Sequence, residues 1–294
     1  MKKPIRHLPF AIRHNLVIGI DSGGTKIRGV LASGKRIIKR AEALHESQIP
    51  SAKQFLKTLF SVIDRLYTPQ IKAICIGIPG VISKQQKIIG EGVVKSLKNI
   101  DIKQVIEKKY HTKVVLENDV KSALAAEAQK AKGRQSIFML TLGTGIGAGW
   151  SLNGKIMKGS FDSAYEIGSM IIDISNLKGW EKELCGAGFF RSRGYDPIGS
   201  EERARAGNMF HKKLWEEFGK NLGIALSNII NLIEPELIII GGGLIHAWDL
   251  FMPQTKQTIK QCVLSPIARQ KTKIIKAKLG KWSGAIGAAI LAKI

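Results

Sequence analysis

The sequence has few of the features of secreted, disulfide-bonded or membrane-spanning proteins. Its 294 residues include three cysteines (Cys75, Cys185 and Cys262), an odd number at wide spacing that predicts no disulfide framework. No run of about 18 or more apolar residues occurs, so no membrane-spanning helix is expected. The basic residues 1–15 lack the apolar core and small-residue cleavage site of a secretory signal. We therefore expect a protein of the reducing cytoplasm.

Acidic residues are scarce as well. The 23 Asp and Glu residues stand against 46 Lys and Arg, which gives a formal net charge of +23. A field of this sign speeds association with polyanions, including nucleic acid. The cations are spread over the whole length, however, and no arginine-rich arm or basic platform with interleaved aromatics occurs. We interpret the charge as a solvated surface, with a nucleic-acid function as the alternative.

Two strand–glycine–strand segments organise what is present. A length of 294 residues suits two domains, and a hydrophobic share of 44% suffices for a sizeable core. Residues 16–32 and 136–152 each contain a strand-like run, a glycine turn and a second strand-like run. No helix follows the glycines, as a Rossmann fingerprint requires, and the Walker pattern G-x-x-x-x-G-K-[ST] is absent. The repeat predicts a duplicated α/β fold in which each half offers a glycine turn.

The first glycine turn follows an acidic residue. Asp21 ends a strand-like run, and Gly23 and Gly24 come directly after it. The turn is either an ordinary surface hairpin or a place where backbone N–H groups approach phosphate oxygens, since no side chain blocks them. In the second case Asp21 would hold Mg²⁺ directly or through water. The second turn, at residues 143–145, would then bind the same triphosphate.

Residues 114–126 contain three polar side chains between a buried strand and an Ala-rich helix. These are Glu117, Asn118 and Asp119. Asn and Asp side chains cap helix N-termini well, which is one interpretation. The other is that Asp119 is a general base at the carboxyl end of a sheet strand, where open α/β sheets bind ligands.

Four further positions have an ordinary interpretation when they are taken alone. Gly80 ends the strand-like residues 71–83 and is typical of a turn. Glu166 lies between a glycine-bearing loop and a predicted strand, where a lone glutamate usually faces solvent. Glu181 lies in residues 179–194, which we expect to be irregular. The strand at 236–245 ends in three glycines, which permit a flat ligand to approach closely. Helical spacing occurs at residues 52–67, 102–109, 202–233 and 283–294.

Seven motifs together resemble the ROK family, named for repressors, open reading frames and kinases. They are DSGGTK, GIPG, ENDVKSALAAEA, TLGTGIGAG, AYEIG, EPELIIIGGG and GAIGAAILA, and they occur in the family's order and spacing from about residue 16 onward. The resemblance implies an actin-like ATPase (ribonuclease H-like) fold, in which two α/β lobes close over a cleft. We expect one lobe to comprise residues 1–119 with the helix at 283–294, and a larger lobe to comprise residues 120–282.

The resemblance also implies a role for each motif residue. The positions that match the family's nucleotide-binding residues are Asp21, Gly23, Gly24, Thr25, Lys26, Gly143, Thr144, Gly145, Gly241, Gly242 and Gly243. Those that match its sugar-binding residues are Gly80, Asn118, Glu166 and, by a looser register, Glu181. Asp119 matches the catalytic base, and Asp21 would hold Mg²⁺.

Two departures from the family pattern bear on cofactors and partners. Ser169 replaces the histidine, and Cys185 stands alone where members that bind structural zinc have three clustered cysteines, so we expect no zinc. Ser169 also removes a sugar contact that the histidine makes in the family. The roughly 15 residues before the fold are too few for the helix-turn-helix domain of repressor members. A homodimer and polyphosphate as an alternative donor to ATP both occur among relatives.

The sequence thus predicts an ATP-dependent kinase that phosphorylates a hexose hydroxyl, the 6-OH in the leading hypothesis. The acceptor would be glucose, mannose, fructose or an N-acetylated hexose. A non-catalytic sugar-binding sensor that retains the fold is the rival, favoured by the missing zinc ligands and the high charge. A DNA-binding regulator is a third hypothesis, and only the net charge of +23 supports it.

Overall fold

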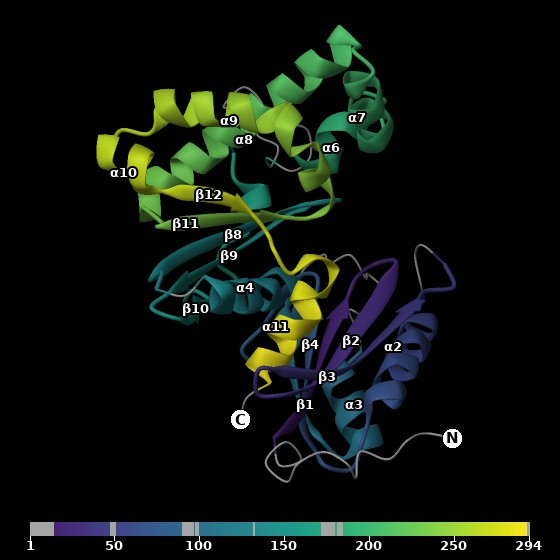
Figure 1. Cartoon of the computed structure of the whole chain (residues 1–294). Coiled ribbons are helices and arrows are strands. Elements are labelled where there is room, and N and C mark those ends of the chain that lie inside the picture. Colours follow the sequence, from purple (N-terminus) through teal and green to yellow (C-terminus); the bar gives the residue numbers. More distant parts are fainter. Residues whose placement is uncertain are drawn as a thin grey trace. The chain divides into compact units, whose positions relative to one another are not determined.

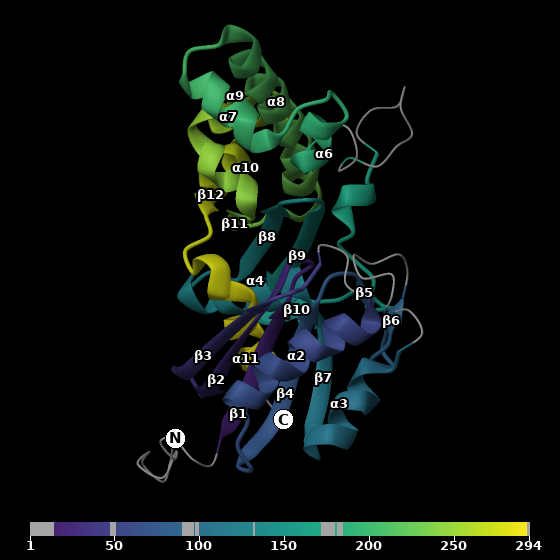
Figure 2. The same ribbon diagram turned by 90° about the vertical axis from the view of Figure 1, so that its right-hand side faces the viewer.

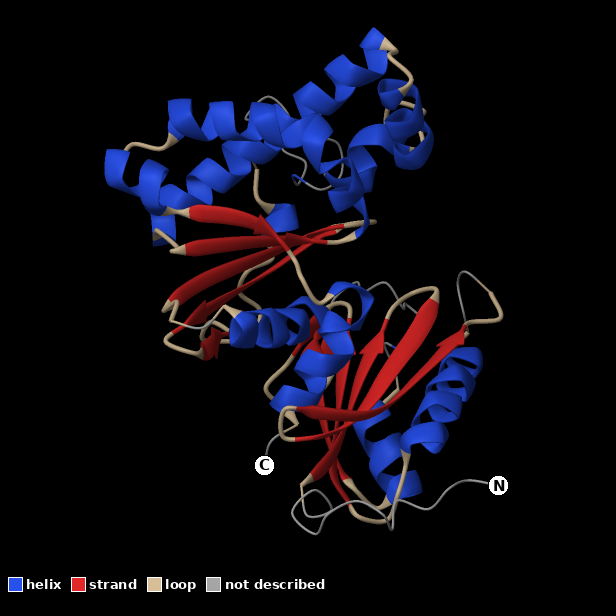
Figure 3. Cartoon of the chain, viewed as in Figure 1, coloured by secondary structure: helices blue, strands red, loops and turns tan. Residues whose placement is uncertain are grey.

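The computed structural model describes residues 15–47, 51–89, 97, 100–131, 133–171, 180 and 185–292. The chain divides into two compact units, and each mixes helices with a five-stranded sheet (Figures 1 and 3). The first unit comprises Met1–Lys132, Lys158–Ala164 and Leu279–Ile294, and the second comprises Gly133–Met157 and Tyr165–Lys278. Across the described ranges, no helix is long and apolar enough to cross a bilayer.

The sheet of the first unit has the strand order β3-β2-β1-β4-β7. The bounds are β1 Leu16–Ser22, β2 Lys26–Ser33, β3 Arg36–Leu44, β4 Ile71–Ile78 and β7 Lys113–Asn118, and a separate pair joins β5 Val81–Ile82 to β6 Ile88–Ile89. Strands β1, β4 and β7 are parallel, whereas β1, β2 and β3 form antiparallel pairs. The carboxyl ends of the three parallel strands therefore meet at one edge.

The two faces of this sheet carry side chains of different size, because strand residues alternate between faces. Large residues such as Ile74 and Ile76 pack under α2 (Ala52–Leu66) and α3 (Ile102–Tyr110), which lie on one face (Figure 2). The opposite face carries small residues, including Ala73, and packs against α4 (Asp119–Lys130) and α11 (Ser283–Leu291). A short 3₁₀ helix, η5 (Gly280–Trp282), leads into α11.

Helix α11 lies close to its neighbours because glycines face both the strand and the adjacent helix. A Cβ atom on Gly19 of β1 would lie 2.1 Å from the carbonyl oxygen of Ala285. A Cβ atom on Gly287 would lie 1.6 Å from the carbonyl oxygen of Ser122 in α4. The close contacts of α11 with β1 and α4 therefore require the small residues at 283–294.

The sheet of the second unit has the order β10-β9-β8-β11-β12. The strands are β8 Ser136–Leu142, β9 Ile146–Leu152, β10 Lys155–Met157, β11 Leu237–Gly241 and β12 Lys273–Lys276. The helices are η3 Ile167–Ser169, α6 Gly186–Arg191, α7 Pro197–Arg205, α8 Met209–Ile233, η4 Gly243–Ala247, α9 Trp248–Cys262 and α10 Pro266–Lys271. Buried aromatic residues of α6, α8 and α9 stack in its core: Phe190, Trp215, Phe218 and Phe251.

Several expected elements are confirmed and others are wrong. Both strand–glycine–strand segments form antiparallel pairs, and the segment at 114–126 forms β7 and α4. The single helix expected at 202–233 is two helices, because α7 ends before Gly207, whose φ is 95°. The irregular segment contains α6, and Glu166 precedes the 3₁₀ helix η3 instead of a strand. The second unit begins at Gly133, not at Val120, since α4 packs against α11 and β4.

Candidate active site

The acidic residues expected in the first unit lie at the carboxyl edge of its three parallel strands. The register pairs Asp21 of β1 with Gly77 of β4, and Gly77 with Glu117 of β7. Asn118 ends β7 and Asp119 begins α4. Ligands of open α/β sheets bind at this kind of edge. The structure thus brings Asp21, Asn118 and Asp119 to one end of one sheet.

Asn118 caps helix α4, as one interpretation of the sequence predicted. Its Oδ1 accepts hydrogen bonds from the backbone N–H groups of Val120 (2.9 Å) and Lys121 (3.0 Å). Its Nδ2 donates to the carbonyl oxygen of Gly80 at 3.1 Å, and Gly80 has a φ of 117° that favours glycine. The capping role and a ligand-binding role are compatible, because the amide has a second N–H with no acceptor in the described ranges.

A buried glutamate, Glu117, pairs with the partly exposed Lys158 at this edge, a contact that the sequence did not indicate. The side chain of Glu117 is 5% exposed, and its Oε2 lies 2.5 Å from Nζ of Lys158. Its Oε1 accepts the backbone N–H of Asn118 at 2.9 Å. Lys158 begins the segment 158–164, to which Lys121 also donates, through the carbonyl oxygen of Asp162. Glu117 thus connects Lys158 to the backbone of Asn118, and this contact holds the backbone immediately before Asp119 in place.

The carboxylate of Asp21 lies against the first turn of α11. A Cβ atom on Gly284 would come within 2.6 Å of Cγ of Asp21, so only glycine leaves room for this side chain. Burial raises the pKa of Asp21 to about 7; the negative charge of Asp119 contributes to the rise, and Arg28 opposes it. Asp21 and Asp119 are therefore close enough to interact electrostatically, and Gly284 is a site residue that the sequence analysis did not single out.

The donor set at this edge fits Mg²⁺. Asp21 and Asp119 offer hard carboxylate oxygens, and a divalent cation would offset the repulsion between them. Within the described ranges, no group of three or more His, Cys, Asp or Glu side chains is placed to hold a metal. Mg²⁺ commonly takes one or two protein carboxylates and completes its octahedron with water and phosphate oxygens.

Substituting Asp21 by asparagine should stabilise the protein in the absence of Mg²⁺ and nucleotide. The pKa of Asp21 rises from 3.8 to about 7 on folding, so ionisation opposes folding increasingly as the pH rises between these values. The asparagine side chain carries no charge to bury. We expect a gain on the order of 4 kcal/mol at pH 8 and less than about 1 kcal/mol at pH 4, measured by urea unfolding. The matched control Asp101→Asn, at the exposed start of α3, should show no such pH-dependent gain.

The glycine turn of the first unit is a tight hairpin turn. The N–H of Gly23 donates to the carbonyl oxygen of Lys26 at 3.0 Å, and a Cβ atom on Gly23 would lie 3.3 Å from that oxygen. The backbone N–H of His45 donates to the carbonyl oxygen of Thr25, and the His45 ring lies 3.2 Å from the carbonyl oxygen of Gly23. The turn is thus held from β3, and the side chain of Thr25 stays exposed.

The two glycine turns of the second unit follow neighbouring parallel strands. Strands β8 and β11 pair Thr141 with Gly241, so the turns 143–145 and 241–243 lie at the same edge. A Cβ atom on Gly143 would have only one neighbour, 3.9 Å away, and one on Gly243 would have none within 4 Å. Packing therefore does not require glycine at these two positions, although the N–H of Gly143 donates to the carbonyl oxygen of Gly145 at 3.0 Å and its own carbonyl oxygen accepts the N–H of Ala187. Gly242 differs, because its φ is 93° and its Cβ atom would clash with Leu142.

Three other residues of the second unit were singled out in the sequence: Glu166, Ser169 and Cys185. Glu166 is exposed, and its carbonyl oxygen accepts the N–H of Ser169, also exposed, at 3.1 Å. Cys185 is buried at the start of α6, and burial raises its pKa to about 12, which favours the thiol over the thiolate that zinc requires. Glu181 lies outside the described residues.

Comparison with known proteins identifies the family. The sequence model of the ROK family matches residues 17–294. The chain belongs to the ROK family. A relative is the glucokinase of Streptomyces coelicolor, 25% identical, with 95% of this chain and 98% of that protein covered. The xylose repressor of Bacillus subtilis is 26% identical and is matched over 97% of this chain and 79% of its own length. ROK relatives therefore include both sugar kinases and repressors.

A solved ROK structure has the same fold. It is the glucokinase of Streptomyces griseus in complex with glucose and AMPPNP, 22% identical, with a TM-score of 0.79 over 95% of this chain and 99% of that one. The likeness confirms the predicted fold class, the two-domain α/β fold of actin-like ATPases. The roles of individual site residues in this ROK protein stay predictions.

Proposed function

We propose that the protein is a sugar kinase that transfers the γ-phosphoryl group of ATP to a hexose hydroxyl. The observation that carries the proposal is the pair of carboxylates, Asp21 and Asp119, at the carboxyl edge of the first sheet. The glycine turns at residues 143–145 and 241–243, which follow neighbouring parallel strands of the second unit, support it. The ROK relatives that are glucokinases support the same reaction class.

In this proposal Asp119 is the general base. Its carboxylate begins α4, and its Oδ1 accepts the N–H of Val120 at 2.9 Å, which orients the side chain. Asp119 would accept the proton of the sugar hydroxyl as the new O–P bond forms, and the O–P bond to ADP breaks. Asn118, tied to Gly80, and Glu166 would hold sugar hydroxyls, with Glu181 as a further proposed contact. The acceptor hydroxyl is proposed to be the 6-OH.

The nucleotide is proposed to bind through backbone N–H groups of the glycine turns. Such groups stabilise phosphoryl charge without reorganisation. The proposed phosphate contacts are Asp21, Thr25 and Lys26 at the first hairpin turn, and Gly143, Thr144 and Gly145 at the second. When bound at Asp21, Mg²⁺ would neutralise charge on the phosphate oxygens. The high positive charge of the chain suits polyphosphate as an alternative donor.

A coupled kinase assay tests the proposal. The purified protein is offered glucose, mannose, fructose, allose and their N-acetyl derivatives, with Mg²⁺-ATP or polyphosphate as the donor. We expect Mg²⁺-dependent formation of a hexose 6-phosphate from at least one of these sugars. If no sugar in the panel is phosphorylated with either donor, the kinase proposal fails.

A non-catalytic sugar sensor is the second candidate. The similarity to the xylose repressor of Bacillus subtilis favours it, as does Ser169 in place of the family's histidine. Calorimetry distinguishes the two candidates. A sensor would bind a hexose saturably while the same preparation, with Mg²⁺-ATP, forms no sugar phosphate.

Substitution of Gly284 by alanine should lower turnover without touching either substrate directly. The added Cβ atom would lie 2.6 Å from Cγ of Asp21 and displace that carboxylate. A displacement of about 1 Å at a reacting centre can cost roughly 10²-fold in rate. We expect a comparable fall in kcat, with a shift to higher Mg²⁺ concentrations for half-maximal activity. Ser283→Ala, in the same turn of α11, is the control and should keep normal kinetics.

A further inference from the structure

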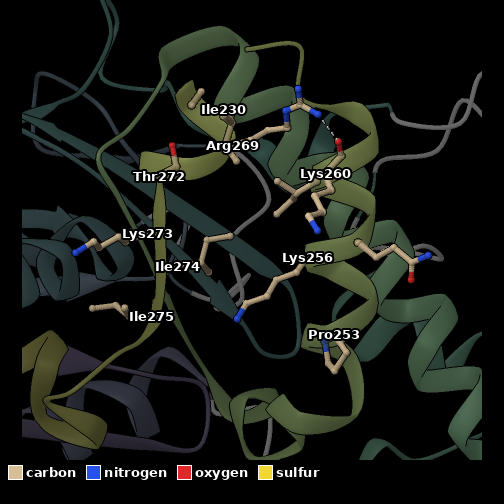
Figure 4. A pocket seen from close by; sticks show the side chains of 12 residues that line it. Ile230, Pro253, Lys256, Lys260, Arg269, Thr272, Lys273, Ile274 and Ile275 are labelled. Atoms are coloured by element: carbon tan, nitrogen blue, oxygen red, sulfur yellow. Dashed lines mark hydrogen bonds between the residues drawn. The ribbon is translucent and has the colours of Figure 1, made fainter. Parts of the chain in front are cut away.

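A hollow of about 710 Å³ lies in the second unit between α9, α10 and β12 (Figure 4). None of its lining residues belongs to the candidate active site. Its walls are aliphatic, with Ile230 from α8, Ile259 from α9 and Ile274 from β12. We call this hollow the α9–β12 pocket. A volume of this size is typical of sites that take small molecules.

Cationic side chains surround these aliphatic walls. Lys256 extends from α9 across the hollow towards β12, and Lys260 lies one helical turn further along the same helix (Figure 4). The guanidinium of Arg269 is fixed at the rim, since its Nη1 donates to the carbonyl oxygen of Lys260 at 2.9 Å. Lys273 of β12 also lines the hollow, but its side chain extends away from α9 (Figure 4). Lys256, Lys260 and Arg269 are exposed, and an anion bound among them would offset the repulsion between their charges.

No acidic group of the lining balances these cations. The pocket contains no Asp or Glu side chain, and the sequence has none from Leu250 to the last residue, Ile294. In the same stretch nine Lys and Arg residues occur. The absence of acid is thus a property of the whole segment that builds the pocket.

Protection of a sheet edge explains only part of this pattern. Strand β12 is an edge strand, and lysines on such strands discourage pairing with other chains. That function accounts for Lys273 and Lys276, which lie on the strand. Lys256 and Lys260 lie on a helix, where no unpaired strand edge needs protection. Protection of a strand edge therefore does not account for their position beside an aliphatic hollow.

We propose that the α9–β12 pocket binds a small phosphorylated molecule. The ammonium groups of Lys256 and Lys260 and the guanidinium of Arg269 hold its phosphate, and the isoleucines contact its carbon skeleton. Several cations match a dianionic phosphate better than a monoanionic carboxylate, and a guanidinium fits phosphate oxygens geometrically. Nucleic acid fits less well, because no aromatic side chain lines the pocket for base stacking. The inference does not rest on the kinase reaction.

Site-resolved lysine labelling tests this assignment on the intact protein. The protein is treated with a lysine-reactive reagent, with and without saturating glucose 6-phosphate, at constant ionic strength, and the modified lysines are quantified by mass spectrometry. We expect labelling of Lys256 and Lys260 to fall at least about fivefold. Lys213 and Lys220, exposed on α8, should be unaffected and serve as internal controls.

Paired charge-neutral variants provide the second arm. The double variant Lys256→Gln/Lys260→Gln should weaken one component of glucose 6-phosphate binding at least about tenfold in calorimetry. Lys213→Gln/Lys220→Gln removes the same charge elsewhere on the unit and should leave that component intact. Equal weakening in both variants, or equal protection of all four lysines, would mean that the net charge acts without a site. Protection by phosphatidic acid vesicles but not by glucose 6-phosphate would also overturn the proposal.

Discussion

Asp119→Asn is expected to lower the rate of sugar phosphorylation by about 10²- to 10⁴-fold, the range typical of losing a general base. Asparagine keeps the size of the side chain and can still orient against the N–H of Val120 through its carbonyl oxygen. It cannot accept the hydroxyl proton at neutral pH. The loss should therefore appear in kcat, while the affinity for the sugar stays within about threefold of the wild-type value.

The control for this variant is Asp101→Asn, which makes the same chemical change at the start of another helix of the first unit. Asp101 caps α3 by accepting the N–H of Gln104 at 2.9 Å, and asparagine caps equally well. Both variants should unfold at nearly the wild-type urea concentration. Should Asp119→Asn keep full activity, Asp119 has no part in the chemistry, and the proposed mechanism fails even if the protein is a kinase.

The parts of the fold that were predictable are those encoded by neighbouring residues. The hairpins β1–β2 and β8–β9 were identified because an apolar run, a glycine turn and another apolar run are adjacent in the sequence. Helix α4 was recognisable from its cap and its alanines. Strand β12 was not anticipated, because its four residues, KIIK, are too few to show a period and carry lysine at both ends.

In the candidate site, too, the residues that are adjacent in the sequence were predictable, and the contacts between distant residues were not. Asn118 and Asp119 were recognisable because a strand end, a cap and a helix start are consecutive. The ion pair between Glu117 and Lys158 was not recognisable from the sequence. The segment 158–164 follows β10 of the second unit but belongs to the first unit. Gly284 could not be recognised as a site residue, because only the fold brings the start of α11 against Asp21.

A substitution at the contact between α11 and α4 should lower the stability of the protein. Gly287→Ala would place a Cβ atom 1.6 Å from the carbonyl oxygen of Ser122. That oxygen belongs to the backbone of α4, so no side-chain rotation relieves the clash and the two helices must separate. In a helix interior, alanine is normally favoured over glycine by about 1 kcal/mol. The steric cost opposes this gain and is larger, because overpacking a dense core costs roughly 1–3 kcal/mol and more where backbone must move.

We therefore expect Gly287→Ala to destabilise the protein by on the order of 3 kcal/mol, measured by urea unfolding followed by far-UV circular dichroism, which reports both units. Gly199→Ala is a matched control in α7, where the nearest atom to the added Cβ lies 3.9 Å away. That variant should be neutral or slightly more stable, as helix propensity alone predicts. Gly287 lies in the interior of α11 and Gly199 in the first turn of α7, so helix propensity alone favours alanine at least as strongly at Gly287, and a loss of stability there reports the helix contact. Equal stability of both variants would show that α11 does not lie this close to α4.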